Sequence, residues 1–409
     1  MNNLSTFYIM RKTILFSGCI VILFSGCGNR NNRQLSQINY SADSDKIYYI
    51  DIEQIAKNTK ADTFTINSLA KNITFIPLET TNESLLSTQF FKVAKIKERY
   101  YISWSRDRIK NSIMEFDSNG RFIANLIQRG QGPQELPMII FWSINRNAQL
   151  LCASSFNQIL FHSFETNTTK KYNFGVSTFY PCLLNDGTVV DQPSFEGTGD
   201  TLVPYLHFRN QAGEIIHTLL NQIGHTYDIP DAGVVFSQLY PSYTGDVLFQ
   251  DIFNDTIYCI KSKDDIKPYI ILNRGSKAPT IKKISNQTTR NQDDYITIHR
   301  VILETPKYFF IKYRYRNMEY CVIWNKQAST FIANINGGHF KETTDVTAST
   351  NDESGFAKYL TPTGEVLFIP IVSYFDGKLY SVLDAEQAME FLPDINEDDN
   401  PVLMIIDIE

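Results

Sequence analysis

Short apolar and alternating segments separated by turn clusters fill the chain from about residue 45 onward. Runs rich in Tyr, Phe, Ile and Val recur there, while apolar residues at helical spacing are scarce, which is typical of β-strands. Most of the turns contain Gly, which accepts the positive φ angles of tight hairpins at little cost. These turns are "FDSNGRF" at 116–122, "LNDGTV" at 184–189, "NQAGEI" at 210–215, "FNDTIY" at 253–258, "TPTGEV" at 361–366 and "YFDGKLY" at 374–380.

The apolar segments group into six units, each of which runs from a strand through a hairpin to another strand. The units cover residues 100–127, 150–174, 182–220, 243–272, 308–335 and 359–383. A period of about 40–60 residues with several strands per unit is typical of β-propellers. We therefore predict an all-β fold over residues 45–409, a six-bladed β-propeller with four-stranded antiparallel blades. A β-sandwich or several smaller β domains remains the alternative.

The N-terminus has the pattern of an export signal. Arg11 and Lys12 precede an apolar run at 13–24, which is shorter than the about 20 residues that a membrane-spanning helix needs. The segment then resembles a bacterial lipoprotein signal, with Ser-Gly-Cys at 25–27, although Phe24 stands where Leu is usual. The resemblance implies a signal peptide at 1–26 and lipid attachment at Cys27.

The tetrapeptide Phe-Ser-Gly-Cys occurs twice, at 16–19 and at 24–27. Cys19 would leave an apolar segment behind the cleavage site, whereas Cys27 has the whole apolar run before it. Residues 27–44 are polar and rich in Asn and Ser, so we interpret them as a flexible tether. Gly28 after Cys27 resembles outer-membrane sorting. The alternative is that both cysteines are ordinary residues of a signal peptide.

Composition narrows the classes of partner. The formal charge is −6, and it becomes −8 without residues 1–26, because that segment holds two basic residues and no acid. An acidic chain without clustered Lys and Arg disfavours nucleic acid as a partner. The remaining cysteines, Cys152, Cys182, Cys259 and Cys321, are widely spaced, and we expect buried free thiols rather than disulfides or a zinc site.

Three segments then resemble a known family. They are "ITFIPLETTNESLL" at 73–86, "YYI" followed by "FDSNG" at 100–120, and "RGQGPQEL" at 129–136. They are similar to the six-bladed β-propeller lipoproteins of Gram-negative bacteria, which are related to NHL-type propellers. The ending "NPVLMIIDIE" at 400–409 resembles the last strand of that family. The resemblance implies that this strand closes the ring with N-terminal residues near "KIYYIDIE" at 46–53.

No segment carries a strong signal for catalysis. The loop at 130–135 lacks the Lys of a phosphate-binding loop, so we interpret it as a turn between blades. The six His residues show no metal-binding spacing, and "DINEDDN" at 394–400 lacks the Gly and the closing Glu of a calcium loop. We therefore expect no catalytic residue, metal or cofactor.

Two basic segments are weak candidates for ligand binding. In "KYRYRN" at 312–317, Lys312, Arg314 and Arg316 alternate with Tyr, so an innermost strand there could present cations to the channel. In "SWSRDRIK" at 103–110, an aromatic residue that could stack on a sugar or peptide precedes three cations. The candidates of this second segment are Trp104, Arg106 and Arg108. The alternative for the first segment is an outer strand with solvated charges. The alternative for Trp104 is packing between blades, and Trp142 and Trp324 carry the same ambiguity.

These features favour a lipid-anchored module of the cell envelope that faces the periplasm or the surface. Such a module binds a glycan, peptide or protein partner, or serves as a scaffold. The family resemblance also implies an alternative, an NHL-type hydrolase or lyase with a metal in its channel. Acidic residues beside the hairpins could serve such an enzyme: Asp117, Asp186, Asp251 and Glu365. A purely structural part of an assembly is the third alternative.

The anchor assignment can be tested directly. Replacing Cys27 by Ala removes the only sulfur to which the predicted lipid would attach. Because several acyl chains hold a protein firmly at a bilayer, we expect the variant to move from the membrane fraction to the soluble fraction. Cell fractionation followed by immunoblotting measures this. Unchanged membrane association of the Cys27→Ala protein would contradict the assignment.

Overall fold

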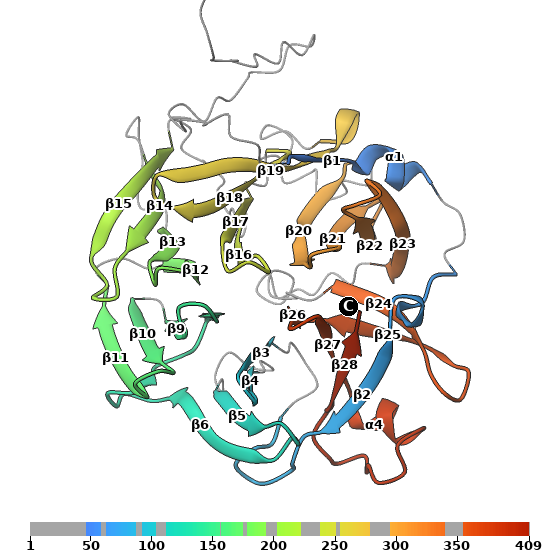
Figure 1. Cartoon of the computed structure of the whole chain (residues 1–409), viewed down its shortest axis with the longest axis horizontal. Coiled ribbons are helices and arrows are strands. Elements are labelled where there is room, and N and C mark those ends of the chain that lie inside the picture. The colour runs from blue at the N-terminus through green and yellow to red at the C-terminus, as the bar shows by residue number, and fades with distance from the viewer. Residues whose placement is uncertain are drawn as a thin grey trace, which may run out of the picture.

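The computed structural model of the protein is a ring of six small antiparallel sheets (Figure 1). One edge strand of each sheet lies near the central axis and the opposite edge strand lies at the rim, so the chain forms a six-bladed β-propeller, as predicted. The structure describes residues 46–58, 63–86, 92–103, 112–155, 157–174, 178–193, 203–221, 238–250, 254–278, 295–339 and 355–408.

The first three blades follow one another along the chain. Blade 1 consists of β3 (Lys92–Ile96), β4 (Arg99–Ser103), β5 (Ile113–Asp117) and β6 (Phe122–Arg129), with the short β7 (Glu135–Leu136) parallel to β6. Blade 2 consists of β8 (Phe141–Asn145), β9 (Leu150–Ser154), β10 (Gln158–Ser163) and β11 (Thr168–Asn173). Blade 3 consists of β12 (Thr178–Leu183), β13 (Val189–Pro193), β14 (Val203–Arg209) and β15 (Ile215–Asn221).

The other three blades include both ends of the described chain. Blade 4 consists of β16 (Gln238–Pro241), β17 (Val247–Gln250), β18 (Thr256–Ser262) and β19 (Asp265–Asn273), with β1 (Tyr48–Asp51) beside β19. Blade 5 consists of β20 (Thr297–Glu304), β21 (Tyr308–Tyr315), β22 (Met318–Asn325) and β23 (Thr330–His339). Blade 6 consists of β26 (Ser373–Phe375), β27 (Lys378–Leu383), β28 (Val402–Asp407) and β2 (Asn72–Pro77).

Helices are short and peripheral. They are α1 (Ile52–Lys57), α4 (Ala385–Met389) and the 3₁₀ turns η1 (Ile66–Ser68) and η2 (Gly275–Lys277). None of the helices in the described ranges is long and apolar enough to cross a bilayer.

Blade 6 closes the ring by pairing the two ends of the propeller. The N-terminal strand β2 runs antiparallel to β28, from Asn72 opposite Asp407 to Pro77 opposite Val402. The closing strand is therefore not the segment near 46–53, and that expectation was wrong. Instead, β1 lies parallel to β19, where Ile50 becomes fully buried in the cluster between blades 4 and 5. The prediction failed because burial of Ile50 holds β1 at blade 4 instead of at the closure of the ring.

An additional hairpin separates blades 5 and 6. It consists of β24 (Gly355–Leu360) and β25 (Val366–Ile371), which form a two-stranded sheet of their own. Its inner face, with Ala357 and Ile369, packs in one apolar cluster with residues of both neighbouring blades. The unit predicted at 359–383 therefore divides between this hairpin and blade 6.

The blades are apolar on both faces because each packs between two neighbours. All five residues of β9 are buried, and so are all five of β13, two of which are the polar residues Asp191 and Gln192. The four cysteines are unbridged thiols, as expected, and all except the half-buried Cys259 are fully buried.

The family motif at 73–86 holds the closing strand in place. After β2 ends at Pro77, the chain forms a loop that is clamped by the buried side chain of Asn400. The Asn400 amide donates to the carbonyl oxygens of Glu79 (2.7 Å) and Ser84 (2.8 Å) and accepts from the Leu86 amide (2.8 Å). Asn400 belongs to the segment that resembles a calcium loop, and it acts here as a structural clamp.

The second motif loop, at 130–135, is a turn between blades, as predicted. The chain loops back beside the end of β6 and resumes the same direction, so that β7 runs parallel to β6, and the Glu135 carboxylate accepts from the Gly132 amide at 2.9 Å. No phosphate cradle is needed to explain these glycines, because a Cβ at Gly130 would lie 1.8 Å from the Glu135 carboxylate.

Two hairpin glycines provide a matched test of ring packing. Gly120 has φ +83°, and a Cβ there would lie 2.1 Å from the Pro77 carbonyl oxygen of blade 6. Gly364 has φ +93° and open space around it. Gly364→Ala should therefore cost about 1–2 kcal/mol of unfolding free energy through backbone strain alone. Gly120→Ala should cost about 1–3 kcal/mol more, because the blade contact must shift. Urea denaturation measures both, and equal losses would contradict the close packing.

Candidate functional site

The central channel holds a cavity that is bounded by described residues. It has a volume of about 610 Å³, and all six innermost strands contribute to its wall. Among its lining residues are Lys92, Trp142, Tyr180, Tyr240, Glu304 and Tyr374, one from each blade. The first hairpin of every blade follows its innermost strand, so these hairpins surround one end of the channel, which we call the hairpin mouth (Figure 1).

Aromatic rings form much of the channel wall. The rings of Phe141 and Tyr180 lie 4.4 Å apart between blades 2 and 3. Tyr180 lies at an irregularity in β12 and has φ +50°, a conformation that costs a non-Gly residue about 1–3 kcal/mol. Buried Trp142 donates from its indole nitrogen to the Ser103 hydroxyl at 2.6 Å. Trp142 therefore both packs and lines the channel, whereas Trp324 packs between blades 4 and 5.

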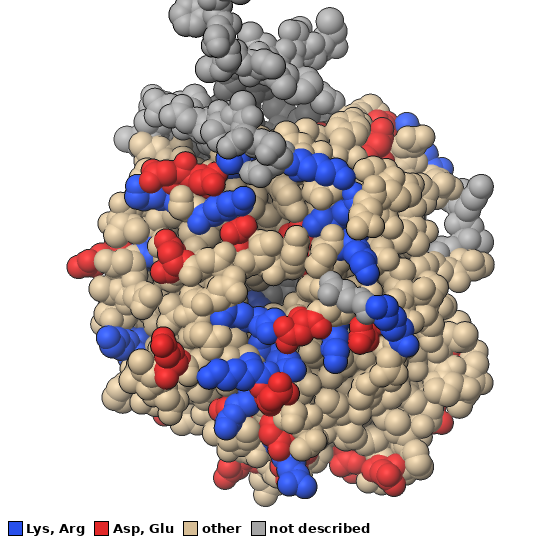
Figure 2. All heavy atoms as spheres, viewed as in Figure 1, with Lys and Arg blue, Asp and Glu red and all other residues tan. Residues whose placement is uncertain are grey.

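An ion pair crosses the hairpin mouth. Arg146 follows β8 in blade 2, and its guanidinium lies 2.6 Å from the carboxylate of Asp376 in blade 6. The same guanidinium lies 5.6 Å from the ring centre of Phe375. Lys97, in the first hairpin of blade 1, lines the same cavity. Figure 2 shows Lys and Arg side chains gathered around the central opening on this face of the molecule.

Three asparagines hold the hairpins of blades 2, 3 and 4 together. Asn145 donates to the carbonyl oxygens of Leu183 (3.0 Å) and Gly245 (2.8 Å). Asn147 donates to the side-chain oxygen of Asn185 at 2.8 Å, and Asn185 donates to the carboxylate of Asp246 at 3.2 Å. These bonds keep this side of the mouth in a fixed geometry.

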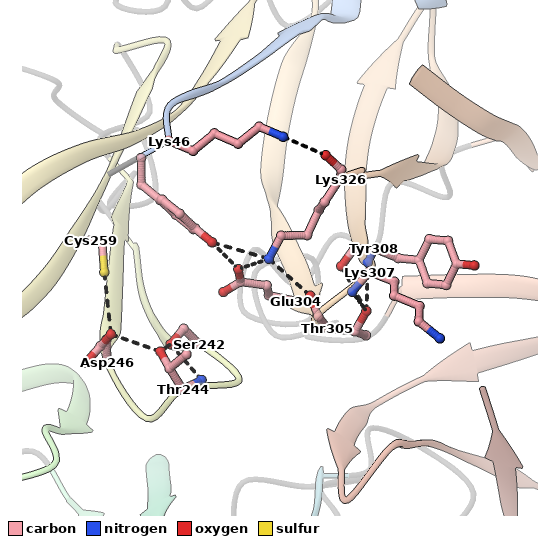
Figure 3. A network of polar contacts seen from close by, with 11 residues as sticks. Lys46, Ser242, Thr244, Asp246, Cys259, Glu304, Thr305, Lys307, Tyr308 and Lys326 are labelled. Carbon is pink, nitrogen blue, oxygen red and sulfur yellow. Dashed lines mark hydrogen bonds and ion pairs between the residues drawn. The ribbon is translucent and has the colours of Figure 1, made fainter. Parts of the chain in front are cut away.

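A buried ion pair lies behind the channel wall between blades 4 and 5 (Figure 3). Lys326, in the turn after β22, lies 2.7 Å from a Glu304 carboxylate oxygen, and the two side chains are only 4% and 1% exposed. The Tyr269 hydroxyl donates to the same oxygen at 2.5 Å. Burial raises the pKa of Glu304, and the Lys326 ammonium opposes this rise. Burial and Glu304 both raise the pKa of Tyr269, so its hydroxyl stays a neutral donor.

Four aromatic rings surround the Lys326 ammonium. Phe309 (4.7 Å), Tyr243 (4.8 Å), Tyr48 (5.4 Å) and Tyr269 (5.9 Å) lie within cation–π range of it. Tyr48 belongs to β1, and the neighbouring Lys46 donates to the Lys326 carbonyl oxygen at 3.0 Å. The N-terminal strand thus completes a structure that supports the channel wall.

Glu304 also separates the channel from a second cavity. This smaller cavity, of about 240 Å³, is lined by Lys46, Tyr48, Asp246 and Tyr269 together with Glu304. In it, Cys259 lies 3.9 Å from Asp246, and burial raises the pKa of the Cys259 thiol to about 12. Cys259 is therefore a neutral thiol, which is a poor nucleophile.

The structure places only two of the predicted ligand-binding residues. Arg314 lies in β21, the second strand of blade 5 rather than its innermost strand, and exposed Arg316 follows in the turn. Neither lines the channel cavity, and Lys312 is buried in an ion pair with Glu319 at 3.4 Å. Cys27, Trp104, Arg106 and Arg108 lie outside the described residues. The roles of these residues in binding and anchoring stay predictions.

Of the hairpin acids named for the enzyme alternative, the three that the structure describes do not line the channel. Asp117 accepts from backbone amides of its own turn, and so does Asp186; Glu365 lies in the β24–β25 turn, and Asp251 lies outside the described ranges. Among the described residues, no group of three or more His, Cys, Asp or Glu could hold a metal ion.

The channel residues were missed because the predicted units begin too late. In blades 1, 2, 4 and 5 the predicted unit starts after the innermost strand of the blade. Lys92 therefore lies before the first predicted unit, and Arg146 and Glu304 lie between predicted units. The sequence does contain a signal that could locate these innermost strands. Each of them comes directly before the first hairpin of its blade. Arg146 and Asp376 both occupy such hairpins.

Removal of Lys326 should show how strongly it supports the wall. Lys326→Met leaves the Glu304 carboxylate buried without its cation, which should cost about 3–5 kcal/mol of unfolding free energy. Glu304→Gln combined with Lys326→Met should recover part of this loss.

The pKa of Glu304 is raised above its unfolded value of about 4.5. The protonated carboxyl is therefore favoured in the folded state, and the loss in Lys326→Met should shrink as the pH falls towards that value.

Chemical denaturation of the three proteins at several pH values measures these effects. A Lys326→Met protein as stable as the parent at neutral pH would show that the ion pair contributes nothing. A double variant less stable than Lys326→Met would show that Glu304 stabilises the fold without its cation.

Comparisons with known proteins agree with the fold. A protein from Bacteroides fragilis NCTC 9343, named as a candidate exported protein, is similar over 89% of this chain and 100% of its own. The identity is 16% and the TM-score 0.63. A DUF4221 family member from Bacteroides vulgatus (11% identity, 82% and 96% covered, TM-score 0.45) is more distant. So is virginiamycin B lyase from Staphylococcus aureus (10% identity, 82% and 99% covered, TM-score 0.40).

The family of the chain follows from its sequence. No curated protein matches the chain. The family described as a domain of unknown function, DUF4934, matches residues 47–407, which include every described strand from β1 to β28. The protein therefore belongs to the DUF4934 family.

Proposed function

We propose that this protein is a lipid-anchored propeller of the cell envelope that binds a glycan or peptide ligand in its central channel. The observation that carries the proposal is the channel itself. Its volume of about 610 Å³ lies in the range of about 300–1,000 Å³ that is typical of small-molecule sites. Its wall combines aromatic rings with a few polar and charged groups, which is also typical of such sites.

The rigidity of the mouth supports a binding role. The asparagine network fixes the hairpins of three blades, and the Lys326 cluster fixes the wall between two others. A site that is already ordered loses little conformational entropy when a ligand binds, so affinity is gained at low cost.

The N-terminal sequence supports anchoring in the envelope. The lipoprotein-like segment ends at Cys27, and the described chain begins at Lys46 close to the hairpin mouth. The similar protein from Bacteroides fragilis is named as a candidate exported protein, which agrees with an envelope location. An outer-membrane position, facing the periplasm or the surface, is part of the same proposal.

The hydrolase or lyase alternative has less support. It needs acidic, Asn or His groups that converge on a metal in the channel. Of the described wall residues of these kinds, Glu304 and Asp376 are engaged in ion pairs, and Asn145 and Asn147 hold neighbouring hairpins. The wall therefore favours binding over metal chemistry.

A ligand screen with paired tyrosine variants tests the proposal. The mature protein, purified in detergent, is screened against glycans and peptides by thermal shift. A ligand at about 100 times its Kd stabilises the native state by about 2.7 kcal/mol. Tyr243 lines the channel and is 43% exposed, whereas Tyr49 is 57% exposed on β1 and does not line it. Tyr243→Ala should weaken a true channel ligand about fivefold or more, and Tyr49→Ala should not.

Two outcomes would overturn the proposal. The first is that no glycan or peptide raises the melting temperature. The second is that every ligand found binds the Tyr243→Ala protein as tightly as the parent.

A further inference from the structure

The Arg146–Asp376 pair is suited to exchange with a ligand. It joins blades 2 and 6 across the hairpin mouth, and its two side chains are 35% and 45% exposed. Ion pairs with this exposure contribute only about 0–1 kcal/mol, because water competes for both charges. A carboxylate that arrives from solvent could therefore take the place of the Asp376 carboxylate at the guanidinium.

The charge of the channel favours an anionic ligand. Its wall contains the cations Lys92, Lys97 and Arg146 and the carboxylates of Glu304 and Asp376. Lys326 adds a further cation behind Glu304. The three wall cations and the two wall carboxylates give the wall a formal charge of +1, in a protein whose total is −6. A cavity with a net positive charge and low-dielectric walls attracts anionic ligands.

Flat ring surfaces lie beside the same cations. Phe375 lies under the Arg146 guanidinium, and Phe141 and Tyr180 form a pair further round the wall. The apolar faces of a sugar ring pack on such surfaces while its hydroxyl groups stay at the edges. Strained Tyr180 agrees with a binding role, because unusual backbone conformations cluster at ligand sites.

A buried hydroxyl in the wall also lacks a partner. Ser373 in β26 is 7% exposed and lines the channel, and its Oγ has no hydrogen-bond partner within the described residues. An unsatisfied buried polar group costs about 1–3 kcal/mol. The wall beside the channel therefore holds a hydrogen-bonding group that no described residue uses.

We propose that the ligand of the channel is an acidic sugar whose carboxylate binds Arg146 in place of Asp376. Asp376 then acts as an internal substitute that holds the guanidinium in position while the channel is empty. The inference rests on the proposed binding function, and it names the chemical class of the ligand.

The two members of the pair should respond in opposite directions. Trigalacturonic acid serves as the probe, and its methyl ester, which lacks the negative charges, serves as the matched ligand. Arg146→Gln should weaken binding of the acid about tenfold or more, because a charge-assisted bond is lost. Asp376→Asn should strengthen binding of the acid about threefold, because a competing carboxylate is removed. The ester should bind the parent about tenfold more weakly than the acid does.

Isothermal titration calorimetry of the mature protein in detergent measures these affinities. Arg121→Gln is the matched control, because Arg121 is exposed in the β5–β6 turn and does not line the channel. Its affinity for the acid should equal that of the parent. Melting temperatures of all variants confirm that they are folded.

Each contrary outcome has a separate meaning. Equal binding of acid and ester would overturn the carboxylate site and leave the proposed binding function intact. Weaker binding by both Arg146→Gln and Asp376→Asn would show that the pair is only structural, and would overturn the exchange. If an acetylated tripeptide with a free carboxylate binds while trigalacturonic acid does not, the sugar class is wrong. If no ligand of either class binds, the proposed function itself fails.

Discussion

Each blade of this protein is a small sheet with two apolar faces, and the fold depends on covering both. A neighbouring blade covers each face, so no blade can be stable alone and the ring must close. The pairing of β2 with β28 achieves this, and Asn400 fixes the loop that follows β2. The same requirement explains the β24–β25 hairpin, which fills the space between blades 5 and 6 with its own apolar face. Ring closure also produces the channel, because six short innermost strands cannot converge on the axis.

The channel wall combines rigid and exchangeable polar contacts. The Lys326–Glu304 pair is almost fully buried, and removal of one partner leaves a charge that water cannot reach. The Arg146–Asp376 pair is partly exposed, and water already competes for it. The first kind of contact defines the shape of the wall, while the second leaves a cation at the mouth that a ligand can use. This difference in solvent access separates supporting residues from candidate binding residues.

Much of the fold could be predicted from the sequence, and little of the site. Hairpin glycines and alternating apolar runs are local signals, so the six units and the antiparallel blades followed from them. Several innermost strands are short, such as β26 with three residues and β16 with four, and carry no clear pattern. Arg146 and Asp376 meet only because the ring brings blade 2 near blade 6. The closing strand was misplaced because two N-terminal segments are equally apolar, and only tertiary packing distinguishes β1 from β2.

The position of β1 has a mechanical consequence for the proposed anchoring through Cys27. A pull that enters the described chain at Lys46 and runs along β1 acts on a strand that is paired along its length with β19. Such a load shears all the β1–β19 hydrogen bonds at once instead of opening them one by one. Because β1 and α1 come before β2 in the chain, this force acts on the β1–β19 pairing of blade 4 before it acts on the closing strand β2. The junction between blades 2 and 6 at the mouth thus remains unloaded while β1 holds.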